Sequence, residues 1–117
     1  SSYDGPSIII AYSTCINHGI DMTHGMEAQK KAVTSGHWPL YRYDPRLADK
    51  GKNPLQMDSK EPSTSLEDYR NGENRYMILK KADPARAEML LNLARKDVSR
   101  SLKIYKSLSE ISFEDEK

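Results

Sequence analysis

Several features that define common protein classes are scarce or missing in this 117-residue sequence. It has one cysteine, which excludes an internal disulfide and favours a reducing compartment. Its apolar runs are far shorter than the roughly 20 residues that a membrane-spanning helix needs, and no signal-peptide pattern is present. We therefore expect a cytoplasmic protein with no membrane partner.

An excess of charge of one sign is also missing. The 18 basic and 17 acidic residues leave a formal charge of +1, and they are dispersed along the chain. This balance creates no extended field for a nucleic acid, so we expect no nucleic-acid partner. A glycine-rich phosphate loop is absent too, because Asp4-Gly5-Pro6 and Lys50-Gly51-Lys52 are only turn signals. No residue is catalytic by pattern.

The apolar content of the chain is low. Hydrophobic residues make up 37% of the sequence, with one Trp and one Phe, and the mean hydropathy is -0.78. A chain of this composition builds only a thin core. We expect other polypeptide to cover part of its apolar surface.

The most apolar stretch is a nine-residue strand signal that includes the β-branched run at residues 8–12 and ends at Cys15. A continuous run of this kind is typical of a strand buried on both faces of a parallel sheet. Such a strand needs neighbours, yet only one other strand is indicated, at 38–43, where Pro39 favours a strand start or an edge. We therefore expect a mostly helical piece of a larger parallel-sheet α/β domain, with about two strands in this sequence.

Three helices are indicated by period and capping signals. The first covers about 23–35, with Met22 and Met26 on its apolar stripe and Gly36 as its cap. The second runs over 66–80 after a capping box at Ser65. The third is long and begins at Asp83-Pro84. Its apolar stripe consists of Ala87, Leu90, Leu91, Ala94, Val98, Leu102, Tyr105 and Leu108.

Between the second strand and the second helix lies a polar, proline-containing connection at 46–65. Leu55 and Met57 alternate with other residues there, which suits a segment in a groove of another part of the protein; a surface loop is the alternative. The whole chain, 1–117, is thus expected to be a portion of one α/β domain. Its parts are strand–helix–strand (1–45), extended connection (46–65), helices (66–110) and tail (111–117).

Cys15 is the main candidate for chemistry, because reactive groups in parallel sheets collect beyond the carboxyl ends of the strands. Three interpretations stay open: a nucleophile paired with His18, a ligand of a metal or iron–sulfur cluster, and a structural thiol. The nucleophile needs a group such as Asn17 or Asp21 to orient the imidazole. A four-cysteine cluster needs three further thiolates from outside this sequence, and the histidines match no structural zinc pattern.

Ordered motifs run through nearly the whole chain. They are Tyr3-Asp4-Gly5-Pro6-Ser7-Ile8-Ile9-Ile10-Ala11-Tyr12, Cys15-Ile16-Asn17-His18-Gly19-Ile20, Gln29-Lys30-Lys31-Ala32-Val33, Trp38-Pro39-Leu40-Tyr41-Arg42-Tyr43-Asp44-Pro45, Gly51-Lys52-Asn53-Pro54-Leu55-Gln56, Leu66-Glu67-Asp68-Tyr69, Glu73-Asn74-Arg75-Tyr76 and Leu79-Lys80-Lys81. As an ordered set, they resemble the C-terminal end of the thiamine-diphosphate-binding domain of pyruvate:ferredoxin (flavodoxin) oxidoreductase.

The resemblance implies a large homodimeric enzyme that converts pyruvate and coenzyme A to acetyl-CoA and CO2 and reduces ferredoxin or flavodoxin. It implies thiamine diphosphate, Mg2+ and [4Fe-4S] clusters in the full-length enzyme. It also implies that Cys15 is the fourth ligand of the cluster nearest the thiamine, and that His18 is a packing residue or supports that site. The family's Gly-Asp-Gly motif for thiamine diphosphate is absent. We therefore expect this chain alone to bind no cofactor and to be inactive.

Two alternatives stay open beside this interpretation. The chain could be a stand-alone interaction module derived from such a domain, in which an exposed strand edge recruits a partner by strand addition. It could also be part of a related 2-oxo acid:ferredoxin oxidoreductase, since no substrate-pocket residue is recognisable in it.

Overall fold

The computed structural model describes residues 2–114, which are mostly helical and contain one two-stranded sheet. The prediction of a mostly helical α/β piece with about two strands is therefore confirmed. The elements in chain order are η1 (Ile16–His18), η2 (Met22–His24), α1 (Gly25–Thr34), β1 (Tyr41–Tyr43), η3 (Pro45–Lys50), β2 (Leu55–Met57), α2 (Leu66–Asn71), α3 (Asn74–Ala82) and α4 (Pro84–Ser109).

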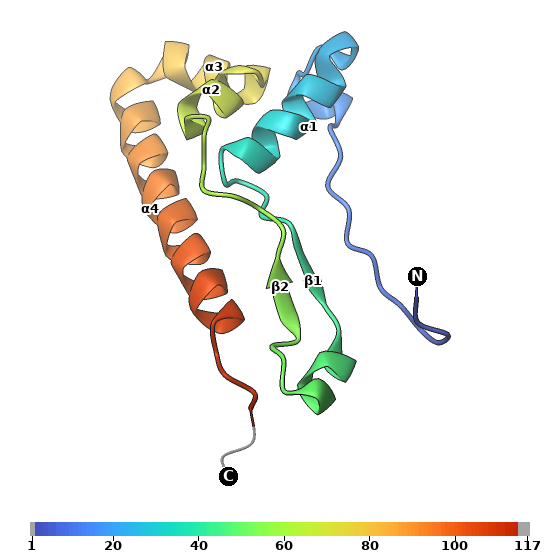
Figure 1. Ribbon diagram of the computed structural model, residues 1–117. Helices are drawn as coiled ribbons and strands as arrows, with labels where there is room; N and C mark the ends of the chain where they lie inside the picture. Colours follow the sequence, from blue (N-terminus) through green and yellow to red (C-terminus); the bar gives the residue numbers. More distant parts are fainter. Residues whose placement is uncertain (1, 115–117) are drawn as a thin grey trace.

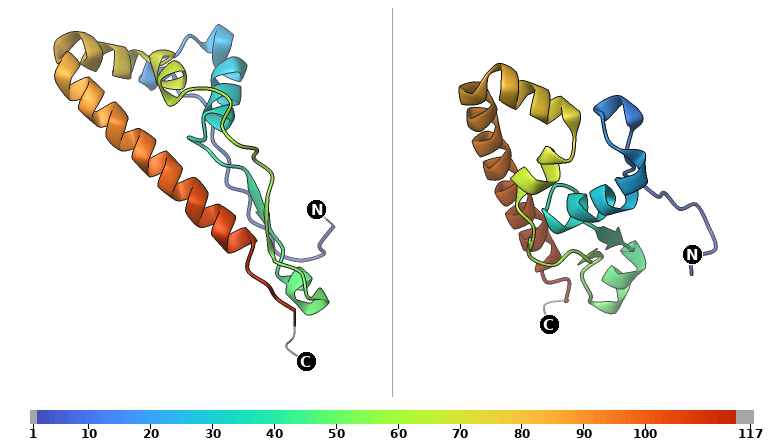
Figure 2. Two further views of the ribbon diagram at one scale, coloured as in Figure 1. Left: turned by 60° about the vertical axis from the view of Figure 1, so that its left-hand side comes forward. Right: turned by 90° about the horizontal axis from the view of Figure 1, so that it is seen from above.

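The molecule is elongated, with principal extents of 60 × 29 × 21 Å. Helices α1, α2 and α3 gather at one end, and the β1–β2 hairpin runs from them towards the other end (Figure 1). The long helix α4 extends along one side of the molecule, and residues 2–15 run along the opposite side (Figure 2). The fold is therefore open and thin, as its low apolar content predicts.

The two strands pair antiparallel, with Tyr41 opposite Met57 and Tyr43 opposite Leu55. The predicted strand at 38–43 is thus present, and its partner lies inside the connection at 46–65. Leu55 and Met57 are half-buried, and β2 packs against α4. The expectation that these two residues lie in a groove elsewhere in the protein is corrected, because their strand is completed within this chain.

A side chain fixes the hairpin to the end of α4. The amide nitrogen of Asn53 donates to the carbonyl oxygens of Leu108 and Ile111 at 2.7 and 2.9 Å. The amide oxygen of Asn53 accepts from the backbone N–H of Leu55 at 2.8 Å. One residue therefore sets the start of β2 and joins it to the C-terminal end of α4.

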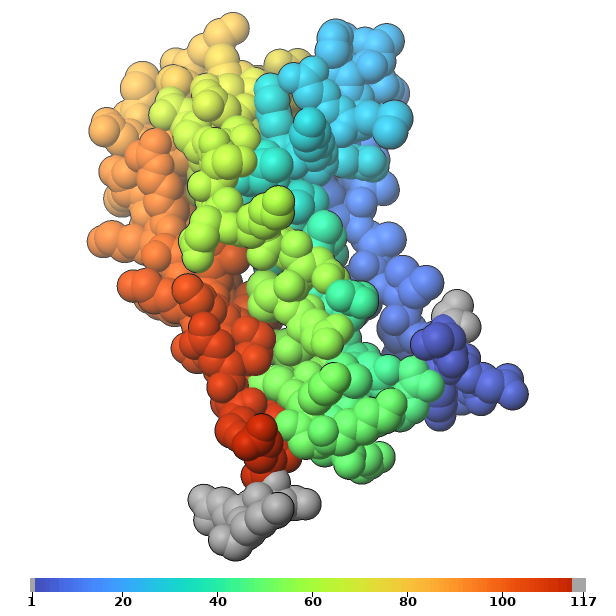
Figure 3. Space-filling model, viewed as in Figure 1, coloured from blue at the N-terminus to red at the C-terminus, as the bar shows by residue number. Residues whose placement is uncertain are grey.

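The apolar run at 8–12 differs from its prediction. It is extended but belongs to no strand, and Ile8, Ile9 and Ile10 are 90%, 91% and 72% exposed. The expected parallel sheet is not present among residues 2–114, where β1 and β2 form the only sheet. Figure 3 shows this segment at the edge of the molecule. The physical reason is that a strand needs a hydrogen-bonding neighbour, and no other segment among residues 2–114 pairs with the apolar run.

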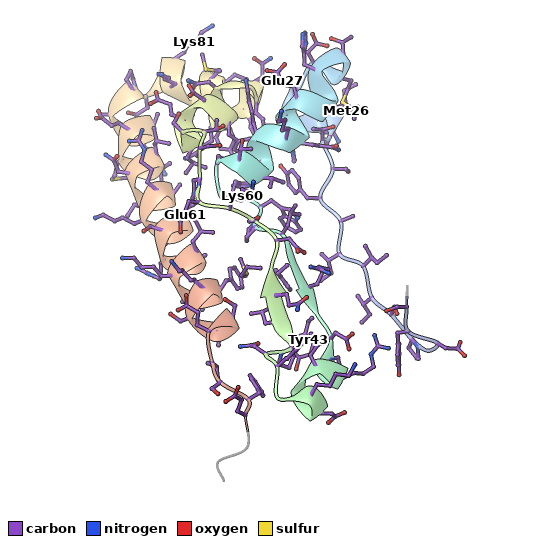
Figure 4. The ribbon with its side chains drawn as sticks, viewed as in Figure 1. Met26, Glu27, Tyr43, Lys60, Glu61 and Lys81 are labelled. Carbon is purple, nitrogen blue, oxygen red and sulfur yellow. The ribbon has the colours of Figure 1, made fainter. Side chains whose placement is uncertain are left out.

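The first helix is shorter than predicted. Gly36 follows its end with φ 77°, a left-handed conformation that favours glycine, which confirms the predicted cap. The inward face of α1 is carried by Ala28, Gln29, Ala32 and Val33. Met26, in contrast, is 86% exposed and projects from the start of α1 (Figure 4), so its predicted place on the packed stripe is wrong.

The predicted helix over 66–80 is split into α2 and α3. Its start is as predicted, because the Ser65 hydroxyl accepts from the backbone N–H of Asp68 at 3.0 Å. The break comes at Glu73, which has extended backbone angles (φ -114°, ψ 124°). The predicted start of α4 is also confirmed, since the Asp83 carboxylate accepts from the N–H of Arg86 and Pro84 is the first helical residue.

The apolar stripe of α4 faces the rest of the chain as predicted, except that Leu108 is exposed. Leu91, Ala94 and Val98 pack against the core cluster. That cluster consists of Ala32, Leu66 and Tyr69, with Tyr12 and Trp38 packed beside it. The core thus joins α1, α2, α4 and the N-terminal segment.

The last residues after α4 have no regular structure from Ile111 to Glu114. The predicted tail extends to 117, and its residues 115–117 lie outside the described residues, as does Ser1 of the predicted unit 1–45. Within residues 2–114, no helix has the length and apolar character that crossing a membrane requires.

We predict that Leu91→Asp destabilises the chain by about 1–3 kcal/mol, because it places an unpaired carboxylate against the core cluster. Leu93→Asp is the matched control, since Leu93 is an exposed leucine on the same helix. Its effect should be within about 0.5 kcal/mol. Urea denaturation of the 117-residue chain measures both changes, and equal losses for the two variants would contradict the observed orientation of α4.

Candidate functional site

Cys15 lies at the end of the extended N-terminal segment and begins the turn η1. Its backbone is extended (φ -131°, ψ 132°), and its carbonyl oxygen accepts from the N–H of His18 at 3.0 Å. The N–H of Gly19 then donates to the carbonyl of Ile16, also at 3.0 Å. The thiol is free and half-buried. Cys15 is therefore held in a short, hydrogen-bonded turn.

Gly19 closes this turn at a close contact with α3. Its φ is 71°, and a side-chain carbon at this position would collide with the Cβ atom of Asn74. The carbonyl oxygen of Gly19 accepts from the backbone N–H of Asn74 at 3.3 Å. Glycine is required here by both the backbone conformation and the close approach. The end of the cysteine turn is thereby fixed to the first residue of α3.

Tyr12 fixes the segment on the other side of Cys15. Its ring stacks on Trp38 with a centroid distance of 5.2 Å and meets the edge of His37 at 5.9 Å. Its hydroxyl is 2.5 Å from the hydroxyl of Tyr69 in α2. The N-terminal segment is thus exposed before Tyr12 and packs against the rest of the chain from Tyr12 onwards.

A buried carboxylate continues this contact. Glu73 is 1% exposed, and its two oxygens accept from the Tyr69 hydroxyl at 3.1 Å and from Arg75 Nε at 2.5 Å. Burial, followed by the contact with Tyr12, raises the pKa of Tyr69 far above its ordinary value. Tyr69 therefore stays protonated and can act as the donor to Glu73. Arg75 balances the charge of the carboxylate.

His18 does not form the pair with Cys15 that a nucleophile would need. The two residues share the backbone bond of the turn, but among residues 2–114 no hydrogen bond joins the thiol to the imidazole, and His18 Nδ1 is buried without a partner. Asp21 does not orient His18, because it caps η2 and contacts Thr23 and His24 instead. The hydrogen bonds from Thr23 lower the pKa of Asp21 below its ordinary value.

The described residues also contain no group of three or more histidine, cysteine or acidic side chains that could hold a metal ion. Any metal or cluster at Cys15 therefore needs ligands from elsewhere. Cys15 was identified from the sequence, whereas the Tyr12–Tyr69–Glu73–Arg75 network was not. Tyr12 and Tyr69 are 57 residues apart, and no local pattern signals their contact.

His37 links this network to pH. Desolvation by the packed rings lowers its pKa below 6.5, and Arg75 and Arg70 lower it further, while the charge of Glu73 opposes them. We predict that the stability linked to His37 is fully present above about pH 6.5 and is lost as the pH falls below that value, so that it is lower at about pH 5.5 than at about pH 7, because the unfolded chain binds the proton more readily. Urea midpoints at these two pH values should differ more for the natural sequence than for His37→Phe. Equal differences would show that His37 does not contribute.

The chain was compared with known proteins, and curated relatives match nearly all of it. It is 54% identical over 108 residues to the pyruvate:ferredoxin oxidoreductase of Moorella thermoacetica. It is 50% identical over 108 residues to the pyruvate-flavodoxin oxidoreductase of Nostoc sp.. It is 40% identical over 116 residues to the probable pyruvate-flavodoxin oxidoreductase of Escherichia coli.

These matches cover 92%, 92% and 99% of the chain but only 9%, 9% and 10% of the respective relatives. The chain thus spans about one tenth of the length of these curated relatives. No family model matches it. The resemblance found in the ordered motifs is confirmed: the chain is homologous to a segment of the pyruvate:ferredoxin and pyruvate-flavodoxin oxidoreductases.

Proposed function

We propose that this chain is part of a cytoplasmic, homodimeric oxidoreductase that decarboxylates pyruvate with coenzyme A and reduces ferredoxin or flavodoxin. The products would be acetyl-CoA and CO2. The support is the three relatives described above, which are named for pyruvate and for ferredoxin or flavodoxin and match the chain at 40–54% identity. Their names favour pyruvate over another 2-oxo acid. Both acceptors occur among them, so the acceptor is left as either of the two.

The chain is, in this proposal, the C-terminal portion of one thiamine-binding-type α/β domain. The exposed run at 8–10 carries this part of the proposal, because exposing three consecutive isoleucine side chains to water is unfavourable. A groove of about 520 Å³ separates the run from β1 and is lined by Trp38, Leu40, Tyr43 and Tyr105, among others. Strands from the rest of the domain would pair with the run and bury it.

More apolar surface surrounds the cysteine turn. Ile16, Met22 and Met26 are all more than half exposed. Burying side chains of this size contributes about 1.5–3 kcal/mol each. His18 Nδ1, which has no partner among residues 2–114, would also gain one. The surface around Cys15 thus has the character of a contact with further polypeptide.

We predict that Ile9→Asp acts differently in the isolated chain and in the full-length enzyme. In the isolated chain, measured at concentrations low enough for it to be monomeric, the effect on the free energy of unfolding should stay within about 0.5 kcal/mol, because the side chain is already exposed. In the full-length enzyme, the buried carboxylate should prevent folding or lower the melting temperature strongly. Ser7→Asp on the same segment is the control and should be tolerated in both. A full-length Ile9→Asp enzyme with normal stability would contradict the proposed strand.

The exposed run also fits the second candidate, a stand-alone interaction module that adds a strand to a partner. The two differ in the behaviour of the purified chain. A piece of a larger sheet should associate through the orphaned run, whereas a module should be monomeric and unfold cooperatively. Size-exclusion chromatography with light scattering distinguishes them, and the proposal predicts association.

We further propose that Cys15 supplies one ligand to a [4Fe-4S] cluster of the full-length enzyme. A free, half-buried thiol in a turn can donate a thiolate, and the turn itself provides acceptors only for the N–H groups of His18 and Gly19. The N–H groups of Ile16 and Asn17 precede its first hydrogen bond, so they remain able to donate to cluster sulfurs. Three further thiolates must come from the rest of the enzyme.

A cluster held partly by Cys15 would supply one-electron transfer. This chain's own role would be to hold the thiolate and shelter it from water. Thiamine diphosphate and Mg2+ would be held by other segments, since the chain has no Gly-Asp-Gly motif for them. The isolated chain should therefore bind no cofactor and have no activity.

We predict that Cys15→Ser in the full-length enzyme removes about one cluster, which is four iron atoms per subunit, and abolishes most pyruvate-dependent electron transfer. Iron analysis and the rate of ferredoxin or flavodoxin reduction measure these losses. Ser13→Ala changes an exposed residue of the same segment and should leave both unchanged. Normal iron content and activity in Cys15→Ser would refute the ligand role.

A further inference from the structure

We propose that Tyr69 and Glu73 are positioning residues that hold the Cys15 turn in place through Tyr12. This inference rests on the proposed ligand role of Cys15. Neither residue touches the thiol. Both belong to the junction between α2 and α3, and this junction fixes the chain on each side of Cys15.

The first anchor lies before the cysteine. Tyr12 precedes Cys15 by three residues, and its hydroxyl meets that of Tyr69. The second anchor lies after the cysteine, where Gly19 contacts Asn74 through a backbone hydrogen bond and a close packing contact. Glu73 directly precedes Asn74 and binds Tyr69. A displacement of Glu73 would therefore move both anchors.

The donors and acceptors of this network can be arranged in one way only. An ionised carboxylate only accepts hydrogen bonds, so the Tyr69 hydroxyl must donate to Glu73. Its oxygen then accepts from the Tyr12 hydroxyl. Arg75 holds the second oxygen of Glu73. The Tyr12 hydroxyl is thereby tied through Tyr69 to the buried charge, while the Tyr12 ring is held by its stacking on Trp38.

Position matters at Cys15 because a bound cluster tolerates little change. Metal–ligand distances lie within about 0.2 Å of their standard values. The potential of an iron–sulfur cluster depends on hydrogen bonds to its sulfurs and on its solvent exposure. If the contact of Tyr12 with Tyr69 were lost, the turn would keep its thiolate, but the hydrogen bonds to the cluster sulfurs and the solvent exposure of the cluster would change. When the network is disrupted, we therefore expect the potential of the cluster to change while its iron is retained.

Tyr69→Phe in the full-length enzyme tests the proposal, because it removes the one hydroxyl that joins Tyr12 to Glu73 and keeps the ring. The electron paramagnetic resonance signal to follow is the one that Cys15→Ser eliminates. In Tyr69→Phe we expect that signal to persist with an altered line shape and a shifted midpoint potential. Pyruvate-driven reduction of the cluster should slow by about tenfold or less.

Two further variants serve as checks. Tyr105→Phe is the matched control, because Tyr105 stacks on Tyr41 in the hairpin and takes no part in the network; signal and potential should be unchanged. Tyr12→Phe should shift the signal and the potential in the same direction as Tyr69→Phe, because both remove the hydrogen bond between the two hydroxyls. The double variant should be no worse than Tyr69→Phe alone, which already lacks that bond and the bond to Glu73. Tyr12→Phe also decides the question if Tyr69→Phe fails to fold.

The possible outcomes separate this inference from the function on which it rests. If Cys15→Ser keeps all its iron, the proposed ligand role fails. If Cys15→Ser loses a cluster but Tyr69→Phe and Tyr12→Phe leave its signal and potential unchanged, only the positioning role is overturned. A shifted potential in both tyrosine variants, with Tyr105→Phe unaffected, supports the proposal.

Discussion

The buried carboxylate of Glu73 is the constraint on which the arrangement around Cys15 depends. Taking an ionised group out of water is costly, and the cost is offset only when its oxygens find strong donors. Glu73 obtains them from Arg75 on one side and from Tyr69 on the other. The extended backbone at Glu73 directs its side chain inward and divides α2 from α3. A single polar requirement therefore accounts for the helix break and for the docking of the N-terminal segment through Tyr12.

The remainder of the fold is held by weaker and more distributed packing. No residue of α4 is fully buried, and the helix contributes a half-buried stripe that contacts the core at one end and β2 further along. Asn53 adds specific hydrogen bonds where the hairpin meets the end of α4. A long helix held in this way needs few large apolar side chains. That agrees with a sequence in which 37% of the residues are hydrophobic.

Local signals in the sequence predicted three of the helix ends. Ser65, Asp83-Pro84 and Gly36 act as caps because each satisfies backbone groups within a few residues of itself. Contacts across long separations were not predictable in the same way. Strand β2 has three residues and is separated from β1 by the turn η3, so no hairpin signal marked it.

The strand predicted at 8–12 shows a different limit. An apolar run indicates that a segment is buried, but the segments that bury it need not belong to this sequence. The exposed isoleucines are consistent with the pattern once their missing neighbours are considered. At the site, position in the sequence and the family resemblance made Cys15 a candidate, whereas the network that reaches it depends on a tyrosine contact spanning 57 residues.

Tyr12 marks the boundary between two parts of the N-terminal segment. After it, the chain is held by contacts with α2 and α3, and before it the isoleucines have no partner among residues 2–114. Cys15 lies just inside the held part, beside exposed apolar side chains such as Ile16. This chain would position the Cys15 thiolate, and the other ligands of the cluster would come from another part of the enzyme. If the proposed cluster forms there, its assembly requires this chain to be docked on the rest of the enzyme, because the chain supplies one thiolate of the four. The network would then fix the position of one ligand, Cys15, before the other ligands bind the cluster.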